Sequence, residues 1–152
     1  MTKVPLHFIA EEPNATIRYD GYYAGGYEIS YTGKDDSWTT YNNETITLSN
    51  TGDKVYFRAF EEGNYTCEGG HFSLQKNIAA RGNILSLLDR DFTHVSGIPD
   101  SCFYKLFEDC TSLTKAPELP ATILADWCYE YMFYGCTSLT QAPTSIPATT
   151  LA

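Results

Sequence analysis

The stretch DSCFYKLFEDCTSLTKAPELPATILA, residues 100–125, returns as DWCYEYMFYGCTSLTQAPTSIPATTLA, residues 126–152. The two copies keep their cysteines, leucines and first prolines at a spacing of 26, and one inserted residue precedes the last proline. Self-similarity at such a period is typical of solenoids, in which each unit buries its apolar face by stacking on its neighbours. The repeat therefore predicts a stack of short units at the end of this chain.

Inside each copy, apolar residues recur every four positions, which is the spacing of one stripe along a helix. The pattern predicts a short strand at 113–116, an extended return through the prolines, and a helix over 125–133 that Asp126 begins and Gly135 ends. Residues 77–99 are predicted to form a shortened first unit, with Val95 equivalent to Leu113. The predicted structural core is Cys102, Leu106, Cys110, Leu113, Leu124, Cys128, Met132, Cys136 and Leu139.

The chain has five cysteines, and four of them occupy matched positions in the repeat. An odd number leaves at least one thiol unpaired, which argues against a complete disulfide framework. We interpret the four repeat cysteines as small buried apolar residues. A zinc site would need more ligands close by than His94 supplies. The sequence therefore predicts no metal site and no cofactor.

The first half of the chain reads as strands. Residues 4–10, 15–19, 27–31, 44–49 and 54–60 alternate apolar and polar side chains and are rich in β-branched and aromatic residues. Turn residues separate these runs every eight to twelve positions. This arrangement predicts a small antiparallel β-sandwich. Residues 77–91 are the first helix-like run, with Asn83 as a plausible N-cap, and we place the domain boundary there.

Composition excludes several functional classes. The net charge is -9 and there is no basic run, which argues against nucleic-acid binding. There is no apolar run long enough to span a membrane. The first twelve residues lack the pattern of a secretory signal, so we expect either a leader that has been removed or another route, such as assembly into a virus particle.

Nothing in the chain assigns a nucleophile, a general base or an oxyanion donor, so we expect no enzyme activity and no catalytic residues. The three histidines are far apart in sequence and none lies in a recognised motif. Aromatic residues make up 14% of the chain, and tyrosine is common at binding surfaces. The predicted binding residues are the loop aromatics Tyr22, Tyr23 and Trp38.

The strings FYGCTSLTQAP and LPATILADWCYEYM resemble the BspA-like leucine-rich repeats of bacterial surface proteins. The resemblance covers about the last 60 residues. The first half, with EISYT, SWTTY and TITLSNTGDKVYFRA, also resembles the β-sandwich that precedes such repeats in surface and phage-borne proteins of gut Bacteroidetes. The resemblance implies a non-catalytic protein that attaches to host proteins, other cells or surface glycans. It fixes no binding residue.

These observations predict a mainly β protein with short helices, in two parts. Residues 1–76 form an immunoglobulin-like antiparallel β-sandwich, and residues 77–152 form a short leucine-rich-repeat α/β solenoid with a cap unit at 77–99 and units at 100–125 and 126–152. The expected function is attachment to a protein or glycan, at the cell surface or outside the cell. The alternative is a phage virion structural or decoration protein, of the capsid or tail fibre, whose sandwich docks on other virion proteins and whose repeats project outward. The open end of the solenoid allows a homo-oligomer.

Overall fold

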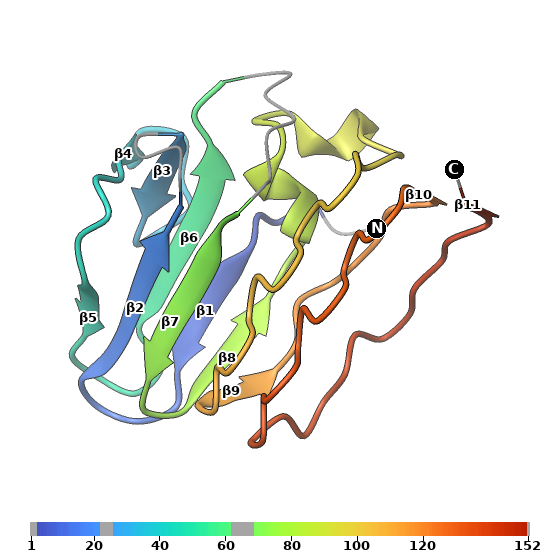
Figure 1. The fold of residues 1–152 in the computed structure, drawn as a ribbon. Helices are drawn as coiled ribbons and strands as arrows, with labels where there is room; N and C mark the ends of the chain where they lie inside the picture. The colour runs from blue at the N-terminus through green and yellow to red at the C-terminus, as the bar shows by residue number, and fades with distance from the viewer. Residues whose placement is uncertain (1–2, 22–25, 62–68, 152) are drawn as a thin grey trace.

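The computed structural model describes residues 3–21, 26–61 and 69–151. Over this part the chain is mainly β, and two sheets pack face to face (Figure 1). The larger sheet has the strand order β4-β3-β6-β1-β8-β9, namely Thr39–Thr40, Tyr27–Ser30, Lys54–Ala59, His7–Ala10, Ile78–Arg81 and Leu113–Lys115. The smaller sheet has the order β5-β2-β7, namely Ile46–Leu48, Ala15–Asp20 and His71–Gln75. A separate parallel pair joins β10 (Ile123–Leu124) to β11 (Thr150–Leu151).

Alternation of side chains explains why these runs form strands. In β6, Val55, Phe57 and Ala59 are buried, while Tyr56 and Arg58 face the other side of the sheet. This is the face pattern expected from the sequence, and the strand confirms it. Burial of a single side chain of this size contributes about 1.5–3 kcal/mol, so one such face is a large part of the stability of a small domain.

The sandwich core is built on three phenylalanines from three strands. Phe8 of β1 lies edge-on to Phe57 of β6, with ring centroids 5.8 Å apart, and to Phe72 of β7, at 4.9 Å. Phe57 and Phe72 are 5.3 Å apart and nearly perpendicular. Edge-to-face pairs add about 0.5–1.5 kcal/mol each to the effect of burial. Because Phe72 belongs to the smaller sheet, the cluster holds the two sheets together.

Residues 78–91 differ from the predicted helical run. Ile78–Arg81 is strand β8, which pairs antiparallel with β1 and is largely buried, so periodicity alone could not separate it from a buried helix. Gly82 turns the chain with φ +80°, at a point where a Cβ would collide with the carbonyl oxygen of Pro5. The 3-10 helix η1 (Ile84–Leu87) follows, capped by Asn83, whose Oδ1 accepts from Leu85 N at 2.9 Å. The predicted boundary at residue 77 therefore falls between β7 and β8, which are both strands of the sandwich.

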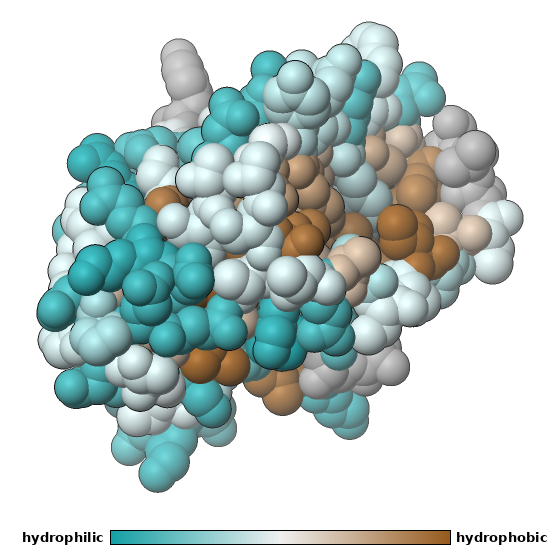
Figure 2. All heavy atoms as spheres, turned by 90° about the horizontal axis from the view of Figure 1, so that it is seen from below, coloured by the Kyte–Doolittle hydropathy of each residue, from teal (hydrophilic) through white to brown (hydrophobic). Residues whose placement is uncertain are grey.

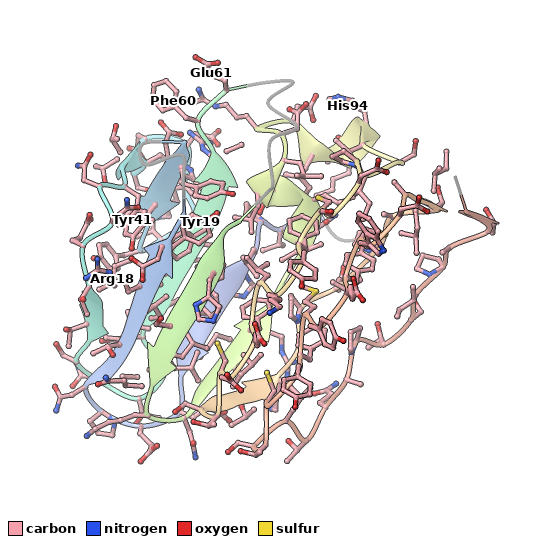
Figure 3. The ribbon with its side chains drawn as sticks, viewed as in Figure 1. Arg18, Tyr19, Tyr41, Phe60, Glu61 and His94 are labelled. Carbon is pink, nitrogen blue, oxygen red and sulfur yellow. The ribbon has the colours of Figure 1, made fainter. Side chains whose placement is uncertain are left out.

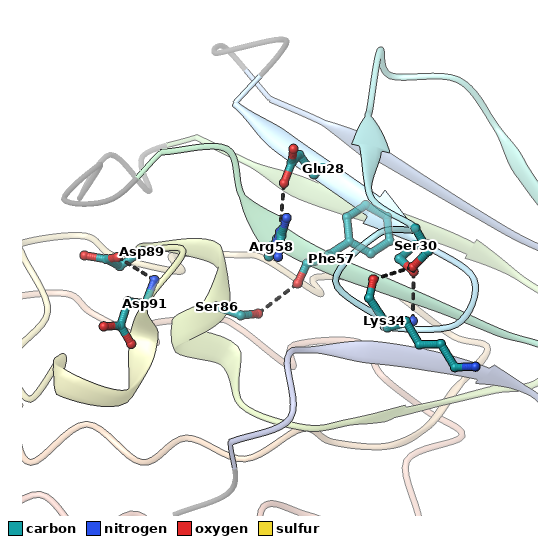
Figure 4. A network of polar contacts seen from close by, with 10 residues as sticks. Glu28, Ser30, Lys34, Phe57, Arg58, Ser86, Asp89 and Asp91 are labelled. Atoms are coloured by element: carbon teal, nitrogen blue, oxygen red, sulfur yellow. Dashed lines mark hydrogen bonds and ion pairs between the residues drawn. The ribbon is translucent and has the colours of Figure 1, made fainter.

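A buried serine fastens η1 to the sandwich. Ser86 Oγ donates to the carbonyl oxygen of Phe57 at 2.9 Å (Figure 4). It also accepts from Leu6 N at 3.0 Å. A second short 3-10 helix, η2 (Phe92–His94), leads into the repeats. Buried polar groups are stable only when their hydrogen bonds are made, as they are here.

The repeats contain turn ladders instead of the predicted helices. We call residues 101–110 and 127–136 the first and second turn ladders. In each, every second N–H donates to the carbonyl three residues earlier, as Leu106 N does to Phe103 O at 3.2 Å. Positive φ angles alternate along them, at residues 101, 103, 105 and 109 and at residues 127, 129 and 131. The predicted helix over 125–133 is therefore wrong, because no α-helix tolerates such angles.

The second turn ladder lies on the first in register. Phe107 N donates to Met132 O at 2.9 Å, and Asp109 N donates to Tyr134 O at 2.7 Å. The Phe107 and Phe133 rings, 26 residues apart, are stacked at 5.7 Å with an interplanar angle of 3°. The spacing found in the sequence is therefore the spacing between neighbouring passes of the chain.

The first unit adds a strand to the larger sheet and contacts the edge of the smaller one. β9 pairs parallel with β8, with Ile78 opposite Leu113, so the predicted strand in the repeat is confirmed. The edge of the smaller sheet contacts the first turn ladder, where Phe72 N donates to Leu106 O at 2.8 Å. The bridge between Gly97 and Ile123 has a spacing of 26, so the predicted equivalence of Val95 and Leu113, 18 residues apart, is wrong. Figure 1 shows the C-terminal passes lying side by side along this edge of the sandwich.

Candidate binding site

Of the predicted binding residues, Tyr22 and Tyr23 lie outside the described residues. Trp38 is half-buried, and the guanidinium of Arg58 lies over its ring, 4.1 Å from the ring centroid. Arg58 Nε in turn lies 2.7 Å from Glu28 Oε2, and both side chains are only 12% exposed (Figure 4). Trp38 therefore covers a buried ion pair on the sandwich, and its predicted role in binding remains a prediction.

The nine predicted core residues differ in how far they are buried. Five are buried: Cys102, Leu106, Cys110, Leu113 and Met132. The other four are partly buried and pack against the core: Leu124, Cys128, Cys136 and Leu139. The first unit lies between the sandwich and the second unit, so its side chains are covered from both sides. The second unit has a described neighbour on one side only.

The cysteines are in two chemical states. Cys102 is buried and disulfide-bonded, which corrects our interpretation of it as a simple apolar residue; burial suits either state, and spacing alone does not reveal a partner. Cys110, Cys128 and Cys136 are free. Cys110 Sγ donates to Phe72 O at 3.1 Å, and Cys136 Sγ donates to Phe107 O at 3.0 Å. The thiols thus repeat one contact from unit to unit.

Burial makes these thiols reluctant to ionise. It raises the pKa of Cys110 from 9.0 to about 12, with smaller contributions from Cys136 and Asp109. It also raises the pKa of Cys136 to about 11. A thiol with so high a pKa is a poor nucleophile at neutral pH, so its role is structural.

This shift predicts a loss of stability at high pH. A raised native pKa contributes stability that is complete below the unfolded pKa of 9.0 and is lost as pH rises toward the native value of about 12. We expect the Cys110→Ala variant to show a shallower decline in unfolding free energy between pH 9 and 11, by up to about 1.4 kcal/mol per pH unit. Urea unfolding at several pH values measures it. The control Cys128→Ala should change the slope less, and identical slopes for Cys110→Ala and wild type would contradict the assignment.

The side chains of the turn ladders follow a two-in, two-out pattern. Cys128 and Tyr129 point inward, Glu130 and Tyr131 outward, and Met132 begins the next inward pair. Three large aromatic side chains lie at outward positions of the second ladder: Trp127, Tyr131 and Tyr134, which are 68%, 51% and 62% exposed. With Tyr104 and Lys105 of the first ladder they form a surface that we call the aromatic face.

Contacts between the three tyrosine rings give this part of the aromatic face a defined arrangement. Tyr131 lies 5.8 Å from Tyr134 and 6.2 Å from Tyr104, in both cases close to edge-on. Lys105 Nζ lies 5.4 Å from the Tyr104 ring and 5.8 Å from the Tyr131 ring. Hydrogen bonding and charge from Glu108, 3.4 Å away, raise the pKa of Lys105. The face therefore combines exposed ring surface with one fixed positive charge.

The three histidines do not come together. The His7 ring stacks on Tyr56 at 4.6 Å, and burial lowers its pKa. His71 Nε2 is 2.7 Å from Glu108 O. His94 is the last residue of η2, and its ring nitrogens lie 3.5 and 3.6 Å from the carboxylates of Asp89 and Asp91 (Figure 3). Among the described residues, no group of three or more histidine, cysteine or acidic side chains could hold a metal ion.

The aromatic face was not predicted as a site, although its residues were visible in the sequence. The signal was the outward position of Tyr131 and Tyr134 relative to the cysteine stripe. Seen from below, the surface is mainly hydrophilic, and separate apolar patches interrupt it (Figure 2). Within residues 3–21, 26–61 and 69–151, no helix is long and apolar enough to cross a membrane.

The arrangement of the aromatic face is that of a contact surface. Its rings alternate along the second turn ladder with Cys128, Met132 and Cys136, which pack in or against the core, so they are presented on a scaffold fixed to the core. No family model, curated protein or solved structure matches the chain.

Proposed function

We propose that this chain is a non-enzymatic attachment protein that binds a protein partner through the aromatic face. The observation that carries the proposal is the exposure of Trp127, Tyr131 and Tyr134 within eight residues of chain. Soluble proteins rarely leave such large side chains together in water without a partner. Tryptophan and tyrosine are also the residues that contribute most to the affinity of protein interfaces.

The surroundings of the rings favour a protein over a small molecule as the partner. Lys105 and Glu108 lie beside Tyr104 and Tyr131 and form an ion pair at 3.4 Å. A charged pair at the edge of an apolar patch is the usual anatomy of a protein interface, where rim charges set orientation and the aromatic centre supplies affinity.

The proposal includes the architecture of the repeats. We propose that the two units form a short BspA-like leucine-rich-repeat solenoid and that the sandwich is its cap. The support is the recurrence of the same contacts at each step: Phe72, Phe107 and Phe133 stack successively at 5.4 and 5.7 Å. Capping by an atypical element is what a repeat array requires at its end.

The expected location is the cell surface or the extracellular space. The disulfide at Cys102 supports it, because disulfides persist in oxidising compartments and are rare in the cytosol.

A pair of matched variants tests the binding proposal. An array of extracellular host proteins, probed with the wild-type chain, identifies the protein that it binds most tightly. We expect the double variant Trp127→Ala with Tyr131→Ala to bind that protein at least about tenfold more weakly, which is the effect of losing one interface hot spot. Tyr31→Ala is the control, because Tyr31 is 58% exposed but lies on the sandwich. Surface plasmon resonance measures both. Equal affinities of the two variants, or no bound protein on the array, would exclude this function for the aromatic face.

A further inference from the structure

A groove opens on another side of the repeats, and it shares no residue with the aromatic face. It has a volume of about 530 Å³ and lies between three segments, residues 93–96, 118–122 and 144–147. Backbone bonds fix two of them: Thr122 N and Ile123 N both donate to Ser96 O, at 2.9 and 3.1 Å. Pockets of 300–1,000 Å³ are the usual size for small ligands. His94 marks the η2 end of this groove in Figure 3.

Hydroxyl groups dominate the polar lining of the groove. Two of them are engaged: Thr93 Oγ1 donates to Asp91 Oδ1 at 2.9 Å, and Thr122 Oγ1 to Ser96 O at 3.3 Å. The hydroxyls of Ser96, Thr144 and Ser145 make no hydrogen bond to any described residue. Each can donate one hydrogen bond and accept two, which matches the hydroxyls of a sugar.

Charge in and around the groove selects against anions. Neither lysine nor arginine lines it, whereas Glu118 does. His94 lies between two carboxylates, those of Asp89 and Asp91. The chain as a whole carries a net charge of -9. A phosphorylated, sulfated or sialylated ligand would meet repulsion here, so the ligand class that fits is neutral.

The apolar part of the lining is rigid. Pro120 and Pro147, which occupy equivalent positions in the two units, both line the groove. Proline rings are fixed surfaces that offer contact to the C–H face of a pyranose with little loss of entropy. A smaller hollow of about 180 Å³ shares Glu118 and Thr144 with the groove, but Arg81 lines it, so it is not part of the neutral site.

We infer that this groove binds a neutral oligosaccharide, held by the hydroxyls of Ser96, Thr144 and Ser145 and by the two prolines. This site is independent of the aromatic face, so the chain has two surfaces for two chemical classes of partner.

A glycan array that carries neutral, sialylated and sulfated oligosaccharides, probed with the full chain, tests the inference. We expect the signal on neutral glycans, unchanged when sodium chloride is raised, because no charged pair is made. Thr144→Val with Ser145→Ala should weaken binding of the best array glycan at least tenfold in calorimetry. Thr137→Val, an exposed threonine outside the groove, is the matched control.

Three outcomes would overturn the inference: no glycan bound, only anionic glycans bound, or equal affinity of the groove variant and the wild type. Binding of extended peptides alone on a peptide array would also do so. The Trp127→Ala with Tyr131→Ala variant separates the two proposals, since it should keep full glycan affinity. Circular dichroism checks that the groove variant retains the wild-type fold.

Discussion

Replacing Phe107 by alanine should lower the free energy of unfolding by about 3–5 kcal/mol, the range measured for large aromatic deletions in cores. Phe107 is fully buried. Its ring centroid lies 6.2 Å from that of Phe8, 5.4 Å from that of Phe72 and 5.7 Å from that of Phe133. These rings belong to both sheets of the sandwich and to the second unit. The deletion therefore leaves a cavity where the two parts of the chain meet.

The equivalent residue of the next unit is the matched control. Phe133 is partly buried and has Phe107 on one face only, so Phe133→Ala should cost clearly less than Phe107→Ala. Urea unfolding followed by circular dichroism gives both values. Equal losses at the two positions would mean that the repeats do not stack on the sandwich as described.

The two tryptophans report whether the parts unfold together. Trp38 lies on the sandwich and Trp127 on the second turn ladder, so Trp127→Phe and Trp38→Phe leave one fluorescent reporter in each part. A shared core predicts one midpoint from both reporters. Two separated midpoints would show that the repeats are an independent unit.

The strands of the sandwich could be predicted because their pattern has only one structural solution. Alternation in 54–60 places Val55, Phe57 and Ala59 on one face, and no other regular structure has period two. β8 lacked this signal, since Ile78, Ala79 and Ala80 are all buried. A continuous apolar run fits a strand covered on both faces as well as a helix.

The turn ladders were missed for a different reason. Cys102, Leu106 and Cys110 recur every four residues, which lies close to the 3.6-residue period of a helix. The same spacing arises in the ladders, where inward and outward pairs alternate. Two features distinguish the ladders from a helix. The spacing of four is kept without drift over two units, and the adjacent residues Phe103 and Phe107 are buried as well.

The groove could not be predicted from sequence. Residues 93–96, 118–122 and 144–147 meet only because the passes stack in parallel, with Gly97 bridged to Ile123. None of the three segments carries a motif. The aromatic face, by contrast, lies on neighbouring passes, and outward-pointing tyrosines could be found once the inward stripe was known.

Replacing Arg58 by alanine should be the second large effect, a loss of about 3–5 kcal/mol. Glu28 and Arg58 lie opposite each other on β3 and β6, and their side chains join at 2.7 Å while only 12% exposed. Removing the guanidinium leaves the Glu28 carboxylate in the sheet without its partner. It also removes the cation that lies 4.1 Å from the centroid of the Trp38 ring. The cost is that of an uncompensated buried charge rather than of a lost attraction alone.

The same ion pair predicts the stability of a double variant. A double variant, Glu28→Gln with Arg58→Met, removes both charges and keeps most of the volume, so it should be clearly more stable than Arg58→Ala. Urea unfolding at pH 7 measures this difference. A double variant no more stable than the single one would assign the loss to packing under Trp38, and the ion pair would then contribute little to the sandwich.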